Sequence, residues 1–160
     1  MKIGVIADTH VRELNDLPRK LVEALMSVDM IVHAGDYTHK RLLDELKTLG
    51  AFKGVYGNTD PKEIRIELPA VNLFKVEGFK IGVTHPAEGG SPVRMEERIR
   101  KKFNEIDIII YGHSHKPRNV TVNDVLYFNP GSPTDSSRVP FKSFGILKIG
   151  KRIEAQIFKL

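Results

Sequence analysis

Side chains that bind metal ions stand where five short apolar runs of the sequence end. The set comprises four histidines, two aspartates and one asparagine, namely His10, His85, His113, His115, Asp8, Asp36 and Asn58. Imidazole nitrogens mixed with carboxylate and amide oxygens suit Mn²⁺, Fe, Ni²⁺ or Zn²⁺ better than Ca²⁺. Seven ligands exceed what one zinc ion normally uses, so the set predicts a pair of ions that share one carboxylate.

The predicted chemistry of such a pair is phosphate-ester hydrolysis. Two ions about 3.5–4 Å apart can hold a bridging hydroxide and clamp a phosphate group between them. The ions lower the pKa of bound water, which makes hydroxide available near neutral pH. The sequence has no cysteine, so a thiolate site is excluded and the ligands must be nitrogen and oxygen atoms.

The apolar runs are rich in Val and Ile and are bounded by Gly or Pro, which predicts buried β-strands. They cover residues 2–7, 30–34, 52–56, 79–84, 106–111 and 125–128. In open α/β sheets, ligands bind at the carboxyl ends of strands, so the polar residues should gather at one edge. Asp8 and His10 are two residues apart, as are His113 and His115, and extended backbone would place each pair on one face.

Three helical patterns, each with a capping residue at its start, lie between these strands. They are residues 17–28 capped by Asn15 or Asp16, residues 38–49 capped by Thr38, and a third that opens at Ser91 and Pro92. The third has apolar residues at helical spacing, at Val93, Met95, Ile99 and Phe103. The order β-α-β-α-β at the start of the chain predicts parallel strands joined by right-handed crossovers.

The remaining segments predict antiparallel strands. Residues 64–68 alternate between apolar and charged side chains, which is typical of a half-buried strand. Residues 73–76 and 79–83 flank Glu77 and Gly78, which predicts a hairpin, and further strands are expected at 119–122, 125–128, 143–149 and 152–158. Two mixed sheets packed together with outer helices make a four-layer α/β/β/α sandwich. We expect it to form one domain over residues 1–160.

The composition favours a cytoplasmic protein. The 160 residues carry a formal net charge of +5 and a pI of about 9.4. The densest basic stretch, residues 98–102, is expected on a solvated helix face, and no aromatic residues interleave with it, so nucleic-acid binding is not favoured. No apolar run approaches the roughly 20 residues of a membrane span, and no signal-peptide pattern is present, so no contact with a membrane is expected.

The candidate ligands form an ordered set of motifs: Asp8-x-His10, Gly35-Asp36, Gly57-Asn58, His85 and Gly112-His113-x-His115. This set resembles the motifs of the calcineurin-like metallophosphoesterase superfamily over essentially the whole chain. The short length, Gly-Asn-Thr-Asp at residues 57–60 and Asn-Pro-Gly-Ser at 129–132 are similar to its small single-domain phosphodiesterase branch. The resemblance implies the four-layer fold.

The same resemblance implies a role for each ligand. One ion would be held by Asp8, His10 and His115, and the second by Asn58, His85 and His113. The carboxylate of Asp36 would bridge the two ions.

The sequence departs from the superfamily at Thr59, where many members carry a histidine that stabilises the transition state or protonates the leaving oxygen. A threonine hydroxyl can donate a hydrogen bond but is a poor general acid. Asp60 is an alternative acid, although a turn residue before Pro61 is the favoured interpretation. We take Asn58, Thr59 and His113 as the candidate catalytic residues, and expect Thr59 to weaken hydrolysis of esters with poor leaving groups.

Other polar residues have a structural interpretation beside a functional one. His33 lies inside an apolar run and is expected to be buried in the core or to support a ligand. His39 and Arg138 could contact substrate, and ordinary surface positions are the alternative. Residues 129–132 form a turn by composition that could present Ser132 or backbone N–H groups to a phosphate.

The prediction is a metal-dependent phosphodiesterase that acts on a small phosphodiester through a hydroxide bridged by two ions. Mn²⁺ or Ni²⁺ is expected, with Fe and Zn²⁺ as alternatives. A phosphomonoesterase or nucleotide phosphatase is one alternative function. A non-enzymatic protein-binding scaffold is another, since a retromer subunit of this fold resembles the chain but has lost ligands. Apolar strands near the C-terminus could leave an edge for a homodimer or higher oligomer.

Overall fold

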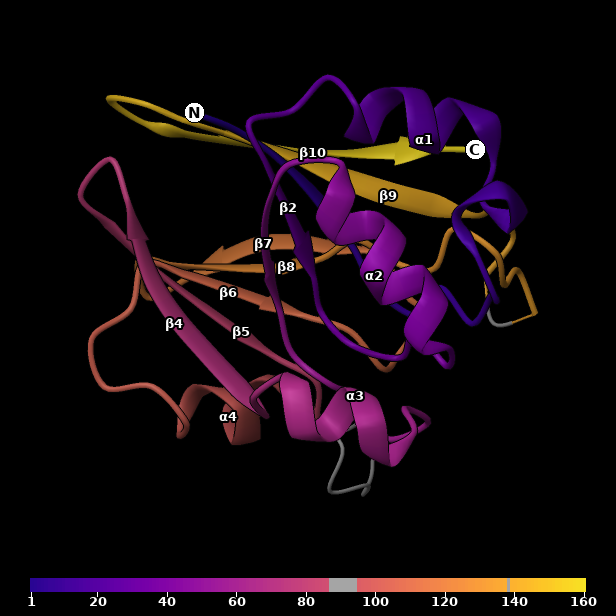
Figure 1. The fold of residues 1–160 in the computed structure, drawn as a ribbon. Helices are drawn as coiled ribbons and strands as arrows, with labels where there is room; N and C mark the ends of the chain where they lie inside the picture. Colours follow the sequence, from indigo (N-terminus) through magenta and orange to yellow (C-terminus); the bar gives the residue numbers. More distant parts are fainter. Residues whose placement is uncertain (87–94, 138) are drawn as a thin grey trace.

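Two five-stranded mixed sheets form the centre of the computed structural model, which describes residues 1–86, 95–137 and 139–160 (Figure 1). The first sheet has the order β10-β9-β1-β2-β3, with strands at Ile153–Lys159, Ser143–Ile149, Lys2–Ile6, Met30–His33 and Ala51–Gly54. Strands β1, β2 and β3 are parallel, and β9 and β10 extend the sheet antiparallel. This arrangement confirms the parallel strands predicted for the start of the chain.

The second sheet has the order β4-β5-β6-β8-β7, with strands at Val71–Val76, Phe79–Thr84, Ile108–Tyr111, Val125–Asn129 and Arg118–Val122. Its three central strands are parallel, and β4 and β7 pair antiparallel at the two edges. The predicted hairpin turn lies at Glu77 and Gly78, whose φ angles of 49° and 87° are both positive, as a tight two-residue turn requires.

Three clusters of buried apolar residues separate four layers. The first cluster lies between the two sheets and includes Ile3, Val83 and Ile110. The second lies on the outer face of the first sheet, under the 3₁₀ turn η1 and helices α1, α2 and α3, at Leu14–Asp16, Arg19–Leu25, Lys40–Thr48 and Lys62–Glu67. The third lies on the outer face of the second sheet, under α4 at Met95–Arg100 (Figure 1). The predicted four-layer α/β/β/α sandwich is confirmed.

The alternating segment at residues 64–68 is a helix, so the predicted strand is wrong. The helix α3 begins after Pro61, whose carbonyl accepts the N–H of Ile64 at 3.0 Å. Ile64 and Leu68 are four residues apart and both are buried, while Ile66 is 76% exposed. A short run with apolar residues at i, i+2 and i+4 fits either period, and here the helical i, i+4 pair faces the core.

Two of the predicted helix caps are displaced. Pro18 is the N-cap of α1, and Asp16 is the last residue of η1, where its carboxylate accepts the N–H groups of Arg12 and of the N-cap Glu13 at 3.2 Å. His39 is the N-cap of α2, one residue after the predicted Thr38. The predicted start of the third helix, at Ser91, Pro92 and Val93, lies outside the described residues.

The described helices are short, and the longest, α2, has 9 residues. None of them has both the length and the apolar character that a membrane crossing requires. They cover the outer faces of the sheets instead, with Leu42, Leu43 and Leu46 of α2 fully buried.

Candidate metal centre

The seven candidate ligands lie just after the ends of five strands, three in the first sheet and two in the second. Asp8 and His10 follow β1, Asp36 follows β2 and Asn58 follows β3 in the first sheet, and His85 follows β5 while His113 and His115 follow β6 in the second. The carboxyl ends of these strands meet at one edge of the sandwich, as the sequence predicted. The site is therefore assembled from loops that only the packing of the two sheets brings together.

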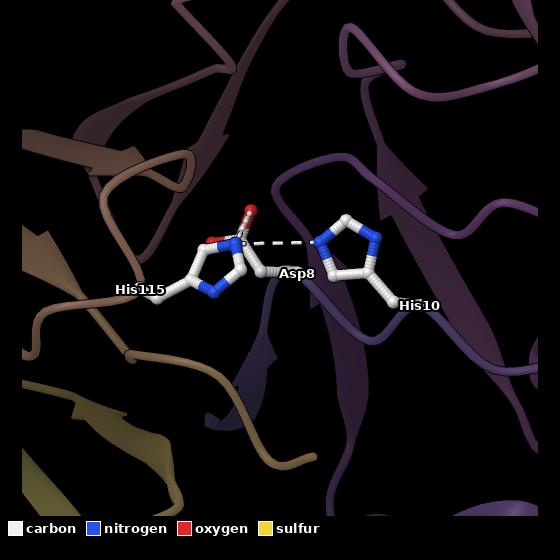
Figure 2. Close-up of side chains that lie close together, drawn as sticks. All are labelled: Asp8, His10 and His115. Atoms are coloured by element: carbon white, nitrogen blue, oxygen red, sulfur yellow. Dashed lines mark hydrogen bonds and ion pairs between the residues drawn. The ribbon is translucent and has the colours of Figure 1, made fainter. Parts of the chain in front are cut away.

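One group of ligand atoms comes from Asp8, His10 and His115, whose side chains point toward one another (Figure 2). The Nε2 atoms of His10 and His115 are 3.3 Å apart, and His115 Nε2 is 3.6 Å from Asp8 Oδ1. Around a tetrahedral zinc ion with bonds of about 2.1 Å, ligand atoms would be about 3.4 Å apart. The spacing of this group fits a bound transition-metal ion.

The second group comes from Asn58, His85 and His113. Asn58 Oδ1 lies 3.0 Å from His85 Nε2 and 2.9 Å from His113 Nδ1. Asp36 stands between the two groups, because its Oδ2 is 3.5 Å from His85 Nε2 and 3.7 Å from His10 Nε2. This is the position that a bridging carboxylate needs.

Hydrogen bonds fix which ring nitrogen of two imidazoles could bind a cation. A carbonyl oxygen can only accept, so His85 Nδ1 must donate to Ala34 O at 2.8 Å, which leaves a lone pair on Nε2 when the ring is neutral. That lone pair faces the Oδ2 of Asp36. Burial lowers the pKa of His85, and the nearby Asp36 carboxylate opposes this shift. Acceptor atoms that face one another across a buried site fit a metal ion between them.

The same argument applies to His115, through a residue that the sequence analysis missed. Asp135 Oδ2 is 2.6 Å from His115 Nδ1, so that nitrogen donates and the lone pair of a neutral ring lies on Nε2, which faces His10 and Asp8. Hydrogen bonds from Ser137 and from His115 hold the pKa of Asp135 below its ordinary value. Asp135 lies in a loop 20 residues after His115, and no ligand-like spacing marks it in the sequence.

The ligand backbone is not extended, which corrects the reasoning from two-residue spacing. Five of the seven candidate ligands have positive φ, at 53° for Asp8, 46° for His10, 63° for Asp36, 78° for His113 and 57° for His115. Asp and His tolerate this left-handed region better than most residues, and such strain clusters at functional sites. The side chains converge because the chain turns sharply after each strand.

Glycines precede the ligands where another loop passes close by. A Cβ on Gly57 would lie 2.1 Å from Asp36 Oδ1, and one on Gly112 would lie 2.8 Å from Ala34 O. Any side chain at these positions would push the ligand loops apart. The Gly-Asn and Gly-His pairs therefore reflect the close approach of loops from different strands.

Asp60 ties two ligand loops together. Its carboxylate accepts backbone N–H groups from Gly57 at 2.7 Å, Thr38 at 2.8 Å and Asp36 at 3.0 Å. Asp60 is 3% exposed, so these bonds support the turn interpretation over a role as general acid. Arg65 holds the same loop from outside, donating to the carbonyls of Asn58 and Asp60 at 2.7 Å each.

His33 supports the site from the core, in agreement with the interpretation favoured from the sequence. Its Nδ1 accepts the Gly35 N–H at 3.1 Å, so its Nε2 donates to the Thr9 hydroxyl at 3.0 Å. Burial lowers the pKa of His33 well below its ordinary value, which keeps the ring neutral. Thr9 lies between two ligands, so this bond connects the loops after β1 and β2.

The polar side chains of the turn at residues 129–132 are buried and form their hydrogen bonds within the protein. Ser132 Oγ donates to the carbonyl of Asp8 at 2.7 Å and accepts the N–H of Asp135 at 3.0 Å. Asn129 accepts the Gly131 N–H at 2.9 Å and donates to Gly112 O at 3.3 Å. Both side chains are fully buried, which supports a structural role for this turn over contact with phosphate.

A small cavity of about 120 Å³ opens between the ligands. It is lined by His10, Asp36, Asn58, Thr59, His113 and His115. The exposed Thr59 donates its N–H to Asp36 Oδ1 at 2.9 Å. His39 is exposed, pairs with the Thr38 hydroxyl and does not line the cavity, and Arg138 lies outside the described residues.

Comparison with known proteins gives consistent matches along the chain. The model of the calcineurin-like phosphoesterase superfamily domain matches residues 1–152. A probable metallophosphoesterase of Methanocaldococcus jannaschii is 36% identical over 100% of this chain and 82% of its own. The structure of an archaeal phosphodiesterase superposes with a TM-score of 0.79 at 26% identity over 100% of both chains. Wild-type Vps29 of Entamoeba histolytica, solved with Zn²⁺, superposes with a TM-score of 0.76 at 25% identity over 99% of both.

Proposed function

The chain belongs to the calcineurin-like phosphoesterase superfamily, and we propose that within it the protein is a metal-dependent phosphodiesterase with two divalent ions. The observation that carries the proposal is the position of Asp36. One of its carboxylate oxygens lies within 3.7 Å of an imidazole nitrogen from each ligand group. Ligand atoms of Asp8, Asp36 and His85 also lie within 4.8 Å of one another, so Asp36 stands where the two groups meet.

The residues of this chain would hold and orient the reacting groups. Asp8, His10 and His115 would bind one ion, Asn58, His85 and His113 the other, and Asp36 both. When bound, the ions would supply Lewis acidity to the phosphoryl oxygens and lower the pKa of water. His113 and Asn58 line the cavity beside Thr59, where the substrate phosphate would sit.

The donor atoms guide the proposed metal and substrate. All of them are nitrogen or oxygen, which favours Mn²⁺ or Ni²⁺ and admits Fe and Zn²⁺. The likeness to a Vps29 solved with Zn²⁺ supports the Zn²⁺ alternative. The likeness to an archaeal phosphodiesterase supports a diester as the substrate. We propose a small diester, because the cavity between the ligands is itself small.

Thr59 would restrict the enzyme to esters whose leaving group departs without a proton from the protein. Its side chain lines the cavity but is a poor acid, so the leaving oxygen would take its proton from solvent. The variant Thr59→His should speed cleavage of a diester with an alkyl leaving group by roughly tenfold or more, within the range of general acid catalysis. Cleavage of bis-p-nitrophenyl phosphate, whose leaving group needs no proton, should change little. Equal rates for the wild type and Thr59→His, on the alkyl diester as well as on bis-p-nitrophenyl phosphate, would contradict this role.

A protein-binding scaffold is the second candidate function, favoured by the likeness to Vps29. The retention of all seven candidate ligands supports the enzyme instead, because a scaffold has no need to orient lone pairs into a buried site. A phosphomonoesterase remains the alternative within the enzyme class.

The test is an assay of the chelated, purified protein on bis-p-nitrophenyl phosphate and p-nitrophenyl phosphate. Mn²⁺, Ni²⁺, Zn²⁺ or Mg²⁺ is added back to the wild type, to Asp36→Ala and to Asp44→Ala, a matched control on the exposed face of α2. We expect metal-dependent cleavage, faster for the diester, that is lost in Asp36→Ala and kept in the control. A preference for the monoester would favour the phosphatase alternative, and no turnover with any metal would favour the scaffold.

A further inference from the structure

A second and larger cavity lies away from the metal centre. It has a volume of about 520 Å³ and opens on the outer face of the first sheet, between α1 and strands β9 and β10. The two cavities share no lining residue. Clefts of roughly 300–1,000 Å³ are typical of sites for small organic molecules.

The floor of this cavity is aromatic and apolar. The rings of Phe144 and Phe158 stack with their centroids 5.3 Å apart and their planes 18° from parallel. Phe144 and Ile146 are almost fully buried, and Ala24 of α1 forms part of the wall. Alanine is small, so Ala24 takes up little of the space, and the half-buried Phe158 stacks on Phe144, which is itself only 2% exposed.

The rim of the cavity is positively charged. Lys2, Lys20 and Lys148 line it, and within the described residues none of the three forms an ion pair with a carboxylate. The Nζ of Lys20 donates to the carbonyl of Lys159 at 2.9 Å, and that of Lys2 to the Ser27 hydroxyl at 3.2 Å.

One acidic residue, Glu154, also lines the cavity, directly opposite Lys148 in the register of β9 and β10. Glu154 is paired with Arg152 at 2.9 Å. Three lysines elsewhere on the surface, Lys40, Lys47 and Lys80, each pair with a glutamate. The cavity thus combines an apolar floor with an excess of positive charge, three lysines against one glutamate.

We propose that this cavity binds a small amphiphilic organic anion. Its apolar group, preferably aromatic, packs on Phe158, and its carboxylate, sulfonate or phosphate lies among the three lysines. The volume favours a small molecule over a protein segment, and the charge excludes a cation. The proposal does not depend on the phosphodiesterase function, because no residue of the metal centre takes part.

The test uses 8-anilinonaphthalene-1-sulfonate, an aromatic anion that fluoresces when bound, on the full chain. N-phenyl-1-naphthylamine, the same molecule without its sulfonate, is the uncharged comparison. We expect saturable binding of one sulfonate per chain, and weaker binding of the uncharged dye. Lys148→Gln should weaken the sulfonate about threefold and Lys20→Gln with Lys148→Gln roughly tenfold, as expected for exposed charge pairs.

Further variants separate the cavity from general surface charge and from misfolding. Ala24→Leu should fill the wall and abolish binding while circular dichroism shows an unchanged fold. The double variant Lys62→Gln with Lys101→Gln lowers net charge equally at exposed positions outside the cavity and should bind like the wild type. Chelation of metal and Asp36→Ala should leave binding unchanged.

Three outcomes would overturn the proposal. Equal affinity for the two dyes would remove the role of charge. Binding that survives Ala24→Leu and both cavity lysine variants, or that requires metal, would place the dye elsewhere. Displacement of the dye by an acidic peptide containing phenylalanine, at lower concentrations than by small aromatic carboxylates, would assign the cavity to a protein partner.

Discussion

The core between the sheets and the ligand edge of the same sheets are built by different rules. The core cluster contains only Ala, Val, Ile, Leu and Phe, supplied by alternate residues such as Ile3 and Val5 of β1. At the edge, the buried residues Asp8, Asp36, Asp60 and His85 follow strand ends within a few residues. Burial of apolar area is non-directional, whereas each buried polar group needs a specific partner.

The comparison teaches that one continuous segment serves two purposes. The residues within the strand stabilise the fold, and those just after it form the candidate site. Within the described residues, every buried side-chain nitrogen or oxygen has a hydrogen-bond partner. At the edge these partners come from other loops, as when Asp60 serves the loop after β2. Substitutions in the core should change the free energy of unfolding alone, and substitutions at the edge should also change metal binding.

Asp60→Ala should have the largest effect, because it should lower both the unfolding free energy and the metal affinity. It would leave three backbone N–H groups without their acceptor, at about 1–3 kcal/mol each, so we expect a loss of about 4 kcal/mol in unfolding free energy. Metal affinity should fall too, because the loops of Asp36 and Asn58 would no longer be joined. Urea denaturation and metal titration measure the two effects. Asp60→Asn, which keeps one acceptor oxygen, should recover part of each.

Leu147→Ala should affect the core alone. Leu147 of β9 is fully buried between the sheets, and such truncations cost about 3–4 kcal/mol of unfolding free energy. The folded fraction should bind metal with wild-type affinity, because the cavity left behind lies within the sandwich. A large change in metal affinity in this variant would show that core and edge are coupled.

Asp135→Ala should affect the edge with little cost to the core. Loss of the carboxylate that orients His115 should weaken metal binding about 10–100-fold, as for other partners of metal-binding histidines. Competition with a chelator measures the affinity, and Asp135→Asn should restore part of it through its amide oxygen. Glu63→Ala, at an exposed carboxylate of α3, is the control. Unchanged affinity in Asp135→Ala would mean that His115 is oriented without this bond.

The smallest expected effect is a pH dependence of the metal-free protein. Burial lowers the pKa of His33 and of His85, so the unfolded chain binds protons that the folded chain does not as pH falls below about 6.5. Stability is complete above that pH and should decline below it, by at most about 1.4 kcal/mol per pH unit for each group. His33→Gln should flatten the decline measured by urea denaturation between pH 7.5 and 5. An equally steep decline in that variant would remove His33 from the account.

The core could be predicted from sequence because its central strands are short, nearly continuous apolar runs, and strands such as β6 and β8 are buried along their whole length. The convergence of the candidate ligands could also be predicted, since they follow the strand ends closely. The supporting contacts could not, because Asp135 and Arg65 reach the site through tertiary packing. The helix α3, Lys62–Glu67, was missed for a related reason, since tertiary burial of Ile64 with Leu68 selects between two periods that the sequence allows equally.

The central claim is that loops from both sheets hold two ions bridged by Asp36. The most direct measurement is the number of Mn²⁺ ions bound per metal-free chain, by equilibrium dialysis and metal analysis, with electron paramagnetic resonance to detect coupling between the ions. We predict two coupled ions in the wild type and at most one, uncoupled, in Asp36→Ala. A single ion in the wild type, or two coupled ions that persist in Asp36→Ala, would contradict the claim.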